Sequence, residues 1–182
     1  MIWIGGNDVR DGLQAGLIDP TGTLTNQILT EAITAIYTHI YNLWALGAQN
    51  FLVLNVPDLS ITPAISELPA PIPDTASFLS STFNNNLAAT LDGLEAAFGV
   101  QIKRMDVFSL LNSVVANPRA FGFKNVSEPC LTFFVADDFL CKKPKRYLFL
   151  DAVHPTTRGH RVLARAAEDL LEDDDDDDDD DD

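Results

Sequence analysis

The sequence predicts an α/β domain built around a parallel sheet. Strand-like apolar runs alternate with helical patterns, which is the chain order that a parallel sheet requires. The runs at residues 1–4, 51–57 and 100–107 are continuously apolar or nearly so, as expected for strands buried on both faces. A further apolar run at 147–150 also predicts a strand and precedes the last helical pattern. Only three parallel strands are predicted with a clear pattern, which is few for a doubly wound sheet.

Helices are predicted between these strands. Apolar residues repeat at spacings of three and four within residues 26–46 and again within 79–98, and each repeat ends at a glycine, Gly47 and Gly99. A short helix is expected around 108–115 and a final one up to Leu171. Two further stretches lack such a pattern. Residues 57–75 carry five prolines and suit an ordered loop over the carboxyl edge of the sheet better than a domain linker, and residues 119–145 are irregular.

Composition favours one folded domain with an acidic tail. The chain has 182 residues, 46% of them hydrophobic, which is enough for a single core. Of its net charge of −15, ten charges belong to the consecutive aspartates at 173–182, which leaves −5 for the rest. We expect a domain over residues 1–171 and a disordered tail over 172–182, serving as a solvated appendage rather than a ligand site. Nucleic acid is disfavoured as a partner, because no basic stripe offsets this charge.

Cysteines, leader signals and apolar runs bear on the cellular compartment of the protein and on whether it crosses a membrane. Cys130 and Cys141 fit a local disulfide in a secreted protein or two thiols in a cytosolic one, and no further ligands stand at metal spacing. A glycosylation sequon at Asn125 favours a secreted protein, as a disulfide would, but neither signal decides the compartment. No run is long enough for a transmembrane segment, and no leader peptide is recognisable. Oligomeric state is not predicted.

The first candidate for chemistry is an aspartate and a histidine three residues apart. Asp151 and His154 stand in "DAVHPTTRGH", between an apolar run and a helix start. Such a carboxylate can fix the imidazole tautomer and stabilise its protonated form, so that the other ring nitrogen takes a proton from a nucleophile. Spacing alone also fits a turn aspartate beside an incidental loop histidine. The other histidines, His39 and His160, suit packing or surface positions within helices.

The second candidate is the glycine turn that follows the first apolar run. In "GGND" the Asn7 amide can donate to an oxyanion at the carboxyl end of a strand, where ligands gather in open α/β sheets. Gly6 allows close approach of the backbone, and Asp8 can brace the turn by bonding to backbone amides. Taken alone, Asn7 fits an ordinary Asx turn better.

Together, these two segments resemble the SGNH or GDSL family of ester hydrolases. "GGND" looks like the third conserved block of that family and "DAVHP" like its fifth, while "PDLSITP" and "YLFLDAVHPT" resemble its phospholipase, lysophospholipase and acetylesterase members. The resemblance implies a three-layer α/β/α flavodoxin-like sandwich with a parallel sheet. It also implies Asn7 as an oxyanion donor, His154 as general base and Asp151 as its orienting partner, acting on a small-molecule or lipid ester without a cofactor.

The serine nucleophile of that family is not recognisable in this sequence. In the family it lies in a Gly-Asp-Ser-Leu block before the glycine turn, and a second block supplies an oxyanion glycine, but neither stands here before "GGND". Ser60 lacks a flanking glycine and is not nominated as a replacement. We therefore expect a partial domain that lacks its N-terminal strands, exposes a sheet edge beside residues 1–4, and is inactive alone.

Two other interpretations stay open from the sequence. The chain can be the non-catalytic product of a shortened gene, acting as an acidic-tailed binding or interaction protein. Alternatively, Asp8, Asp151 and His154 can hold a metal ion, although hard metals usually recruit more carboxylates than these turns provide.

Overall fold

The computed structural model describes residues 1–132 and 139–172, in two compact units. The first unit comprises Met1–Ser60 and Ala70–Phe108, and the second comprises Ile61–Pro69 and the described residues from Ser109 onward. The expected aspartate tail lies, from residue 173, outside the described residues. The single-domain boundary at residue 171 stays a prediction.

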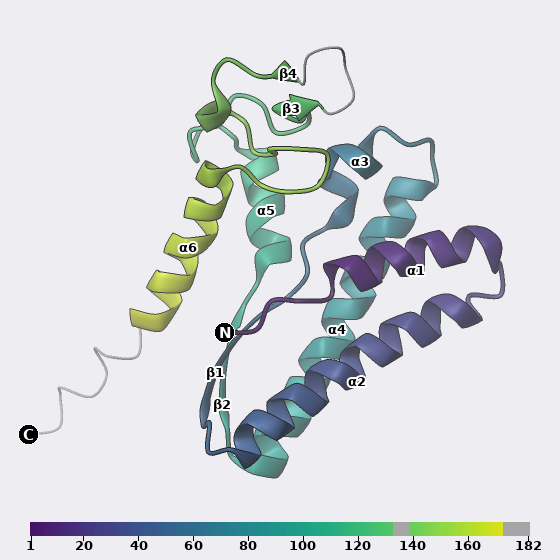
Figure 1. Cartoon of the computed structure of the whole chain (residues 1–182), viewed down its shortest axis with the longest axis vertical. Helices are drawn as coiled ribbons and strands as arrows, with labels where there is room; N and C mark the ends of the chain where they lie inside the picture. The colour runs from purple at the N-terminus through teal and green to yellow at the C-terminus, as the bar shows by residue number, and fades with distance from the viewer. Residues whose placement is uncertain (133–138, 173–182) are drawn as a thin grey trace, which may run out of the picture. The chain divides into compact units, whose positions relative to one another are not determined.

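A two-stranded parallel sheet lies along one side of the helices of the first unit (Figure 1). Strands β1 (Asn50–Leu54) and β2 (Gln101–Met105) pair in parallel register along their whole length. The predicted α/β class with a parallel sheet is thereby confirmed. The strand predicted at residues 1–4 is wrong in extent, because only Ile2 forms a bridge, to Val53. Its N–H donates to Leu52 at 2.8 Å and its carbonyl accepts from Leu54 at 2.9 Å.

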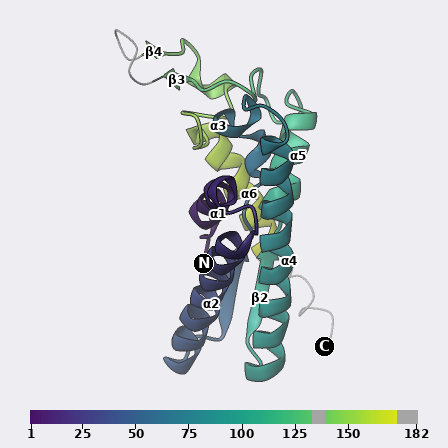
Figure 2. The ribbon, with the colours of Figure 1, turned by 90° about the vertical axis from the view of Figure 1, so that its right-hand side faces the viewer.

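Three long helices pack together beside these strands (Figure 2). They are α1 (Gly6–Ile18), α2 (Thr23–Ala45) and α4 (Ile72–Phe98). The predicted periodicity of α4 is confirmed, since its repeating apolar side chains are buried, namely Leu79, Phe83, Leu87, Leu91 and Leu94. None of the described helices combines the length and apolar character needed to cross a membrane.

Helix α1 has no counterpart among the predicted elements. Its three glycines weaken any helical pattern, since glycine is a poor helix former. The structure shows what Gly12 contributes: a Cβ there would lie 3.3 Å from a methyl carbon of Leu29 on α2. The hydroxyl of Thr25 also donates to the Gly12 carbonyl at 2.8 Å. The glycine that hides the helix from sequence analysis therefore allows α1 and α2 to pack closely.

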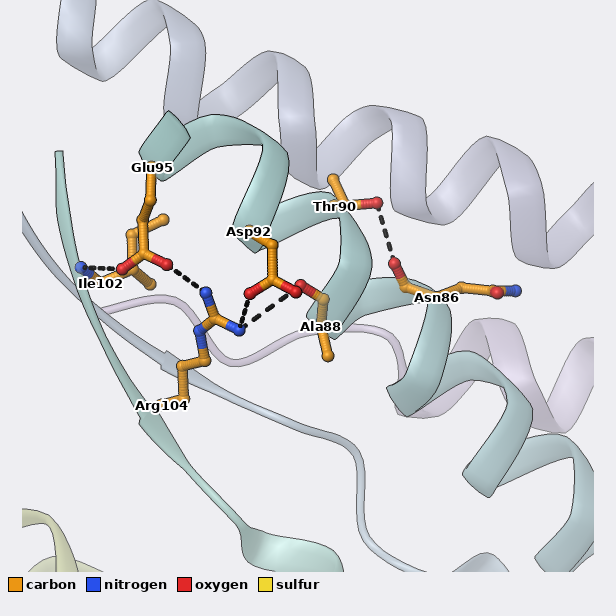
Figure 3. A network of polar contacts seen from close by, with 7 residues as sticks. All are labelled: Asn86, Ala88, Thr90, Asp92, Glu95, Ile102 and Arg104. Carbon is orange, nitrogen blue, oxygen red and sulfur yellow. Dashed lines mark hydrogen bonds and ion pairs between the residues drawn. The ribbon is translucent and has the colours of Figure 1, made fainter. Parts of the chain in front are cut away.

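An arginine on β2 is held by two acids of α4 (Figure 3). One terminal nitrogen of Arg104 lies 2.6 Å from a carboxylate oxygen of Asp92, and the other pairs with Glu95. Glu95 also accepts a hydrogen bond from the backbone N–H of Ile102 at 3.1 Å. Glu95 therefore links α4 to both the side chains and the backbone of β2.

The second unit combines one longer helix, α6 (Thr157–Glu172), with short elements connected by irregular chain (Figure 1). The 3₁₀ turn η1 (Leu59–Ile61) and helix α5 (Val107–Ala116) span the boundaries between the units. The other elements are helix α3 (Pro63–Ser66), strands β3 (Leu131–Thr132) and β4 (Phe139–Leu140), and the 3₁₀ turn η2 (Pro144–Arg146). β3 and β4 pair antiparallel in a stretch that was expected to be irregular.

The strand predicted at residues 147–150 is also wrong. This segment forms only isolated bridges, from Tyr147 to Asn125 and from Phe149 to Pro155. Its hydrogen bonds go to several different partners, and Leu150 donates to a residue in the same turn, His154. Leu148 and Phe149 are nevertheless fully buried. The apolar run therefore reflects burial in the core of the second unit rather than a place in a sheet.

Candidate active site

The side chains of Asp151 and His154 are in direct contact. The Nδ1 atom of His154 lies 2.9 Å from Oδ2 and 3.1 Å from Oδ1 of Asp151. The backbone N–H groups of Val153 and His154 donate to Oδ1 at 2.8 and 2.7 Å. One carboxylate thus closes the turn and also orients the imidazole ring.

The environment of this pair favours an ionised carboxylate beside an accessible imidazole. Partial burial of Asp151 alone would raise its carboxyl pKa, but the backbone N–H groups of His154 and Val153 and the imidazole outweigh that effect, and the net pKa is lowered. The Asp151 side chain is 22% exposed and that of His154 is 73% exposed. With Nδ1 engaged by the carboxylate, Nε2 has no hydrogen-bond partner among the described residues and is free to exchange a proton.

The turn that carries the pair is fixed from several sides within the second unit. Leu150 donates to the His154 carbonyl at 2.7 Å, and Ala64 of α3 donates to the Ala152 carbonyl at 2.9 Å. Directly after the turn, the buried hydroxyl of Thr156 accepts from the N–H of Gly159 in the first turn of α6. The predicted helix start at this point is confirmed, and it anchors the histidine turn to α6.

The predicted oxyanion turn opens α1 in the first unit. Gly5 precedes the helix with a φ of 110°, and Gly6, Asn7 and Asp8 form its first turn. Asn7 is exposed, and neither its side chain nor that of Asp8 forms a hydrogen bond to another described residue. The bracing bonds expected from Asp8 are therefore not found in the described part of the chain. Instead, the Asp8 carboxylate lies at the positive end of the helix dipole.

Gly5 has a role that the sequence analysis did not assign. A Cβ at this position would lie 2.5 Å from Cζ of Phe83 and 3.0 Å from a methyl carbon of Val56. Only glycine combines the positive φ with this close contact. The first glycine of "GGND" thus allows the turn to pack against the buried ring of Phe83. At Gly6, by contrast, an added Cβ would have no atom within 4 Å.

Comparison with known proteins identifies the family. The model of the GDSL-like lipase/acylhydrolase family matches residues 1–167 of this chain. The chain belongs to the GDSL-like lipase/acylhydrolase family. This membership bears out the resemblance that the "GGND" and "DAVHP" segments indicated.

Two relatives illustrate the similarity. A GDSL esterase/lipase of Arabidopsis thaliana is 30% identical over 172 residues, which cover 87% of this chain and 48% of the relative. An acetylesterase of Thermothelomyces thermophilus is 27% identical over 170 residues, which cover 92% of this chain and 50% of the relative. The chain therefore spans about half the length of the curated relatives it matches.

Within this GDSL-family chain, the predicted site residues fall into two groups, one in each compact unit. Asp151 and His154 form one group in the second unit, whereas Gly6, Asn7 and Asp8 form another in the first. That the two groups converge on one cleft stays a prediction. Among residues 1–132 and 139–172, no three histidine, cysteine, aspartate or glutamate side chains are grouped so that they could hold a metal ion.

The two cysteines are joined by a disulfide bond. Cys130 and Cys141 are both buried, and the N–H of Cys141 donates to the Cys130 carbonyl at 2.6 Å. Cys130 in turn donates to the carbonyl of Phe149, two residues before Asp151. The disulfide therefore lies beneath the segment that leads into the histidine turn.

Proposed function

We propose that this protein carries the acid–base half of a serine-dependent ester hydrolase. The observation that carries the proposal is the hydrogen-bonded pair of Asp151 and His154, in which Nε2 of the histidine has no hydrogen-bond partner among the described residues. The family membership supports the same chemistry. The nucleophilic serine belongs to a Gly-Asp-Ser-Leu block that does not stand before "GGND" in this sequence.

His154 acts as the proton shuttle of the reaction. As the serine Oγ attacks the ester carbonyl, Nε2 of His154 takes the hydroxyl proton. It then returns this proton to the leaving alcohol, which leaves an acyl-enzyme. Water attacks the acyl group by the same route, losing a proton to Nε2 and releasing the acid and the free serine.

Asp151 and Asn7 stabilise charges that develop during these steps. The carboxylate of Asp151 accepts a hydrogen bond from Nδ1, which keeps Nε2 unprotonated before attack and stabilises the imidazolium afterwards. The Asn7 amide donates to the oxyanion of the tetrahedral intermediate. Asn7 stands in the first turn of α1, where backbone N–H groups also have no partners within the helix.

The substrate class is proposed as a small-molecule ester. Among the relatives, one is named an acetylesterase and others are named esterase/lipases. A short activated acyl ester such as p-nitrophenyl acetate is therefore the first substrate to assay.

The proposal is tested by joining the chain to a segment that carries a Gly-Asp-Ser-Leu block. Residues 1–182 are fused to the N-terminal half of the Thermothelomyces acetylesterase, and turnover of p-nitrophenyl acetate is compared with that of the chain alone. We expect turnover and fluorophosphonate labelling of the supplied serine in the fusion, and neither in the chain alone. Because a fusion can fail to fold, the gene's own upstream reading frame, joined to Met1, provides a second route.

The controls separate catalysis from folding. His154→Ala should abolish turnover in the active protein, whereas His160→Ala, an exposed histidine on α6, should leave it unchanged. Specific labelling of a serine within residues 1–182, or turnover that survives His154→Ala, would contradict the proposal.

A further inference from the structure

A depression of about 820 Å³ in the second unit is lined by positive side chains. Its charged lining consists of Arg119, Lys124, Lys145, Arg146 and Arg158, and no acidic residue is among the described lining residues. We call this surface the cationic depression. Neither Asp151 nor His154 lines it, so it is separate from the candidate acid–base pair.

The charge of the cationic depression is not neutralised by the described part of the protein. None of its five cations forms an ion pair with another described residue, whereas Arg104 in the first unit is paired with both Asp92 and Glu95 (Figure 3). Nine of the chain's twelve lysines and arginines fall between residues 119 and 165, although the whole chain has a net charge of −15. A concentrated positive surface on an acidic protein points to an anionic ligand.

Arg158 is held in place before any ligand binds. Its Nε–H donates to the carbonyl of Phe121 at 3.1 Å, and its guanidinium carbon lies 5.7 Å from the centre of the Phe123 ring. Between these residues, Gly122 has a φ of 77°, and a Cβ there would lie 2.0 Å from a terminal nitrogen of Arg158. The missing side chain at Gly122 thus makes room for the guanidinium. An arginine fixed in this way loses little conformational entropy when it binds an anion.

We propose that the cationic depression binds the phosphate group of a ligand. A phosphate offers several acceptor oxygens and up to two negative charges, which match the fork of a positioned arginine surrounded by further cations. A single carboxylate would leave most of these donors unused. The volume of about 820 Å³ leaves room beside the phosphate for the rest of a phosphoester, either soluble or part of a lipid headgroup.

Calorimetric titration of the full chain with glycerol 3-phosphate tests this site, at constant ionic strength because exposed charges are screened by salt. Vesicles of phosphatidylcholine with and without phosphatidylglycerol provide the lipid arm, measured by sedimentation. Saturable binding of glycerol 3-phosphate identifies a soluble phosphoester. Binding only to vesicles that contain phosphatidylglycerol identifies a lipid headgroup, and either result supports the proposal.

Two double variants with the same change in charge distinguish binding at the depression from non-specific electrostatic attraction to the protein. Lys145→Ala/Arg146→Ala removes two cations of the depression, and we expect about a tenfold loss of affinity, the effect of losing one charge-assisted hydrogen bond. Lys142→Ala/Lys143→Ala removes two exposed lysines that do not line it, and the affinity should stay within about twofold. Thermal unfolding confirms that both variants fold.

Two results would overturn the proposal. The first is that neither glycerol 3-phosphate nor the anionic vesicles bind. The second is that both double variants weaken binding equally, which would indicate unspecific attraction.

Discussion

His154 contacts the carboxylate of Asp151 through both its ring and its backbone: its Nδ1 atom lies 2.9 Å from Oδ2, and its backbone N–H donates to Oδ1 at 2.7 Å. The carboxylate is thus stabilised in its ionised form by donors from the backbone and the side chain of one partner. Its pKa is lowered as a result, even though partial burial acts in the opposite direction.

This lowered pKa predicts a dependence of stability on pH. The carboxylate of an unfolded Asp has a pKa of about 3.9, and the folded value is lower. The stabilising contribution of Asp151 is therefore fully present above the unfolded value and is lost as the pH falls through the folded one. We expect Asp151→Asn to reduce the free energy of unfolding at pH 7 and to have a smaller effect near pH 3, measured by urea denaturation. Asp11→Asn, an exposed carboxylate, is the control, and a pH-independent effect of Asp151→Asn would contradict the prediction.

The proposed roles predict an order of catalytic effects in a protein that carries the serine block. Loss of the Asn7 donor in Asn7→Ala should lower kcat by about 10²- to 10³-fold, as is usual for one oxyanion donor. Asp151→Asn should cost less than His154→Ala, because Asp151 orients the base and does not itself transfer the proton. Steady-state kinetics with p-nitrophenyl acetate measure the order, and Asn85→Ala on the exposed face of α4 is the control. Equal rates for Asn7→Ala and Asn85→Ala would exclude Asn7 from the oxyanion site.

Gly5 and Gly93 should respond in opposite directions to the same substitution. Gly5→Ala places a methyl group against Phe83 at a positive φ, so we expect a loss of about 2 kcal/mol or more in the free energy of unfolding. Gly93 lies within α4 with no atom within 4 Å of an added Cβ, so Gly93→Ala should stabilise by about 0.5–1 kcal/mol. Chemical denaturation of both variants checks the pair. A neutral Gly5→Ala would show that the ring of Phe83 can move aside.

The acids that hold Arg104 should differ in importance (Figure 3). Asp92 is 69% exposed and contributes only a surface ion pair, so Asp92→Ala should cost less than about 1 kcal/mol. Glu95→Ala also deprives the N–H of the buried Ile102 of its acceptor, which should raise the cost to about 1–3 kcal/mol. Thermal or urea unfolding gives both values. Equal losses would mean that the backbone contact contributes nothing.

Removal of the aspartate run should leave the fold intact. Residues 173–182 contain only aspartate, which has no apolar surface to bury, and the apolar residues of the last helix end at Leu171. We expect the unfolding midpoint of a chain ending at Glu172 to stay within a few degrees of that of the full chain at moderate salt. A larger fall in the midpoint would show that the run stabilises the domain.

Elements with a strong local pattern were predictable from the sequence. Helix α4 repeats leucine and phenylalanine on one face and ends before Gly99, and β1 is a short apolar run, so periodicity was sufficient for both. Helix α1 was missed because its glycines serve close packing against α2, which no local pattern shows. The apolar run before Asp151 resembles a strand because burial and strand pairing leave the same signature in a sequence.

The candidate site was predictable only where it is local. The contact between Asp151 and His154 joins residues three apart, so spacing was enough to indicate it. Gly5 contacts Phe83, which lies 78 residues further along the chain. The cations around Arg158 likewise come from several segments of the sequence. Such juxtapositions depend on the tertiary fold, which a single sequence does not reveal.

The hydrogen bonds that organise Asp151 and His154 all arise within one short stretch of chain. Substitutions that leave this stretch and its anchors, Ala64 and Thr156, in place can therefore alter the surfaces that select a ligand without disturbing the orientation of the imidazole.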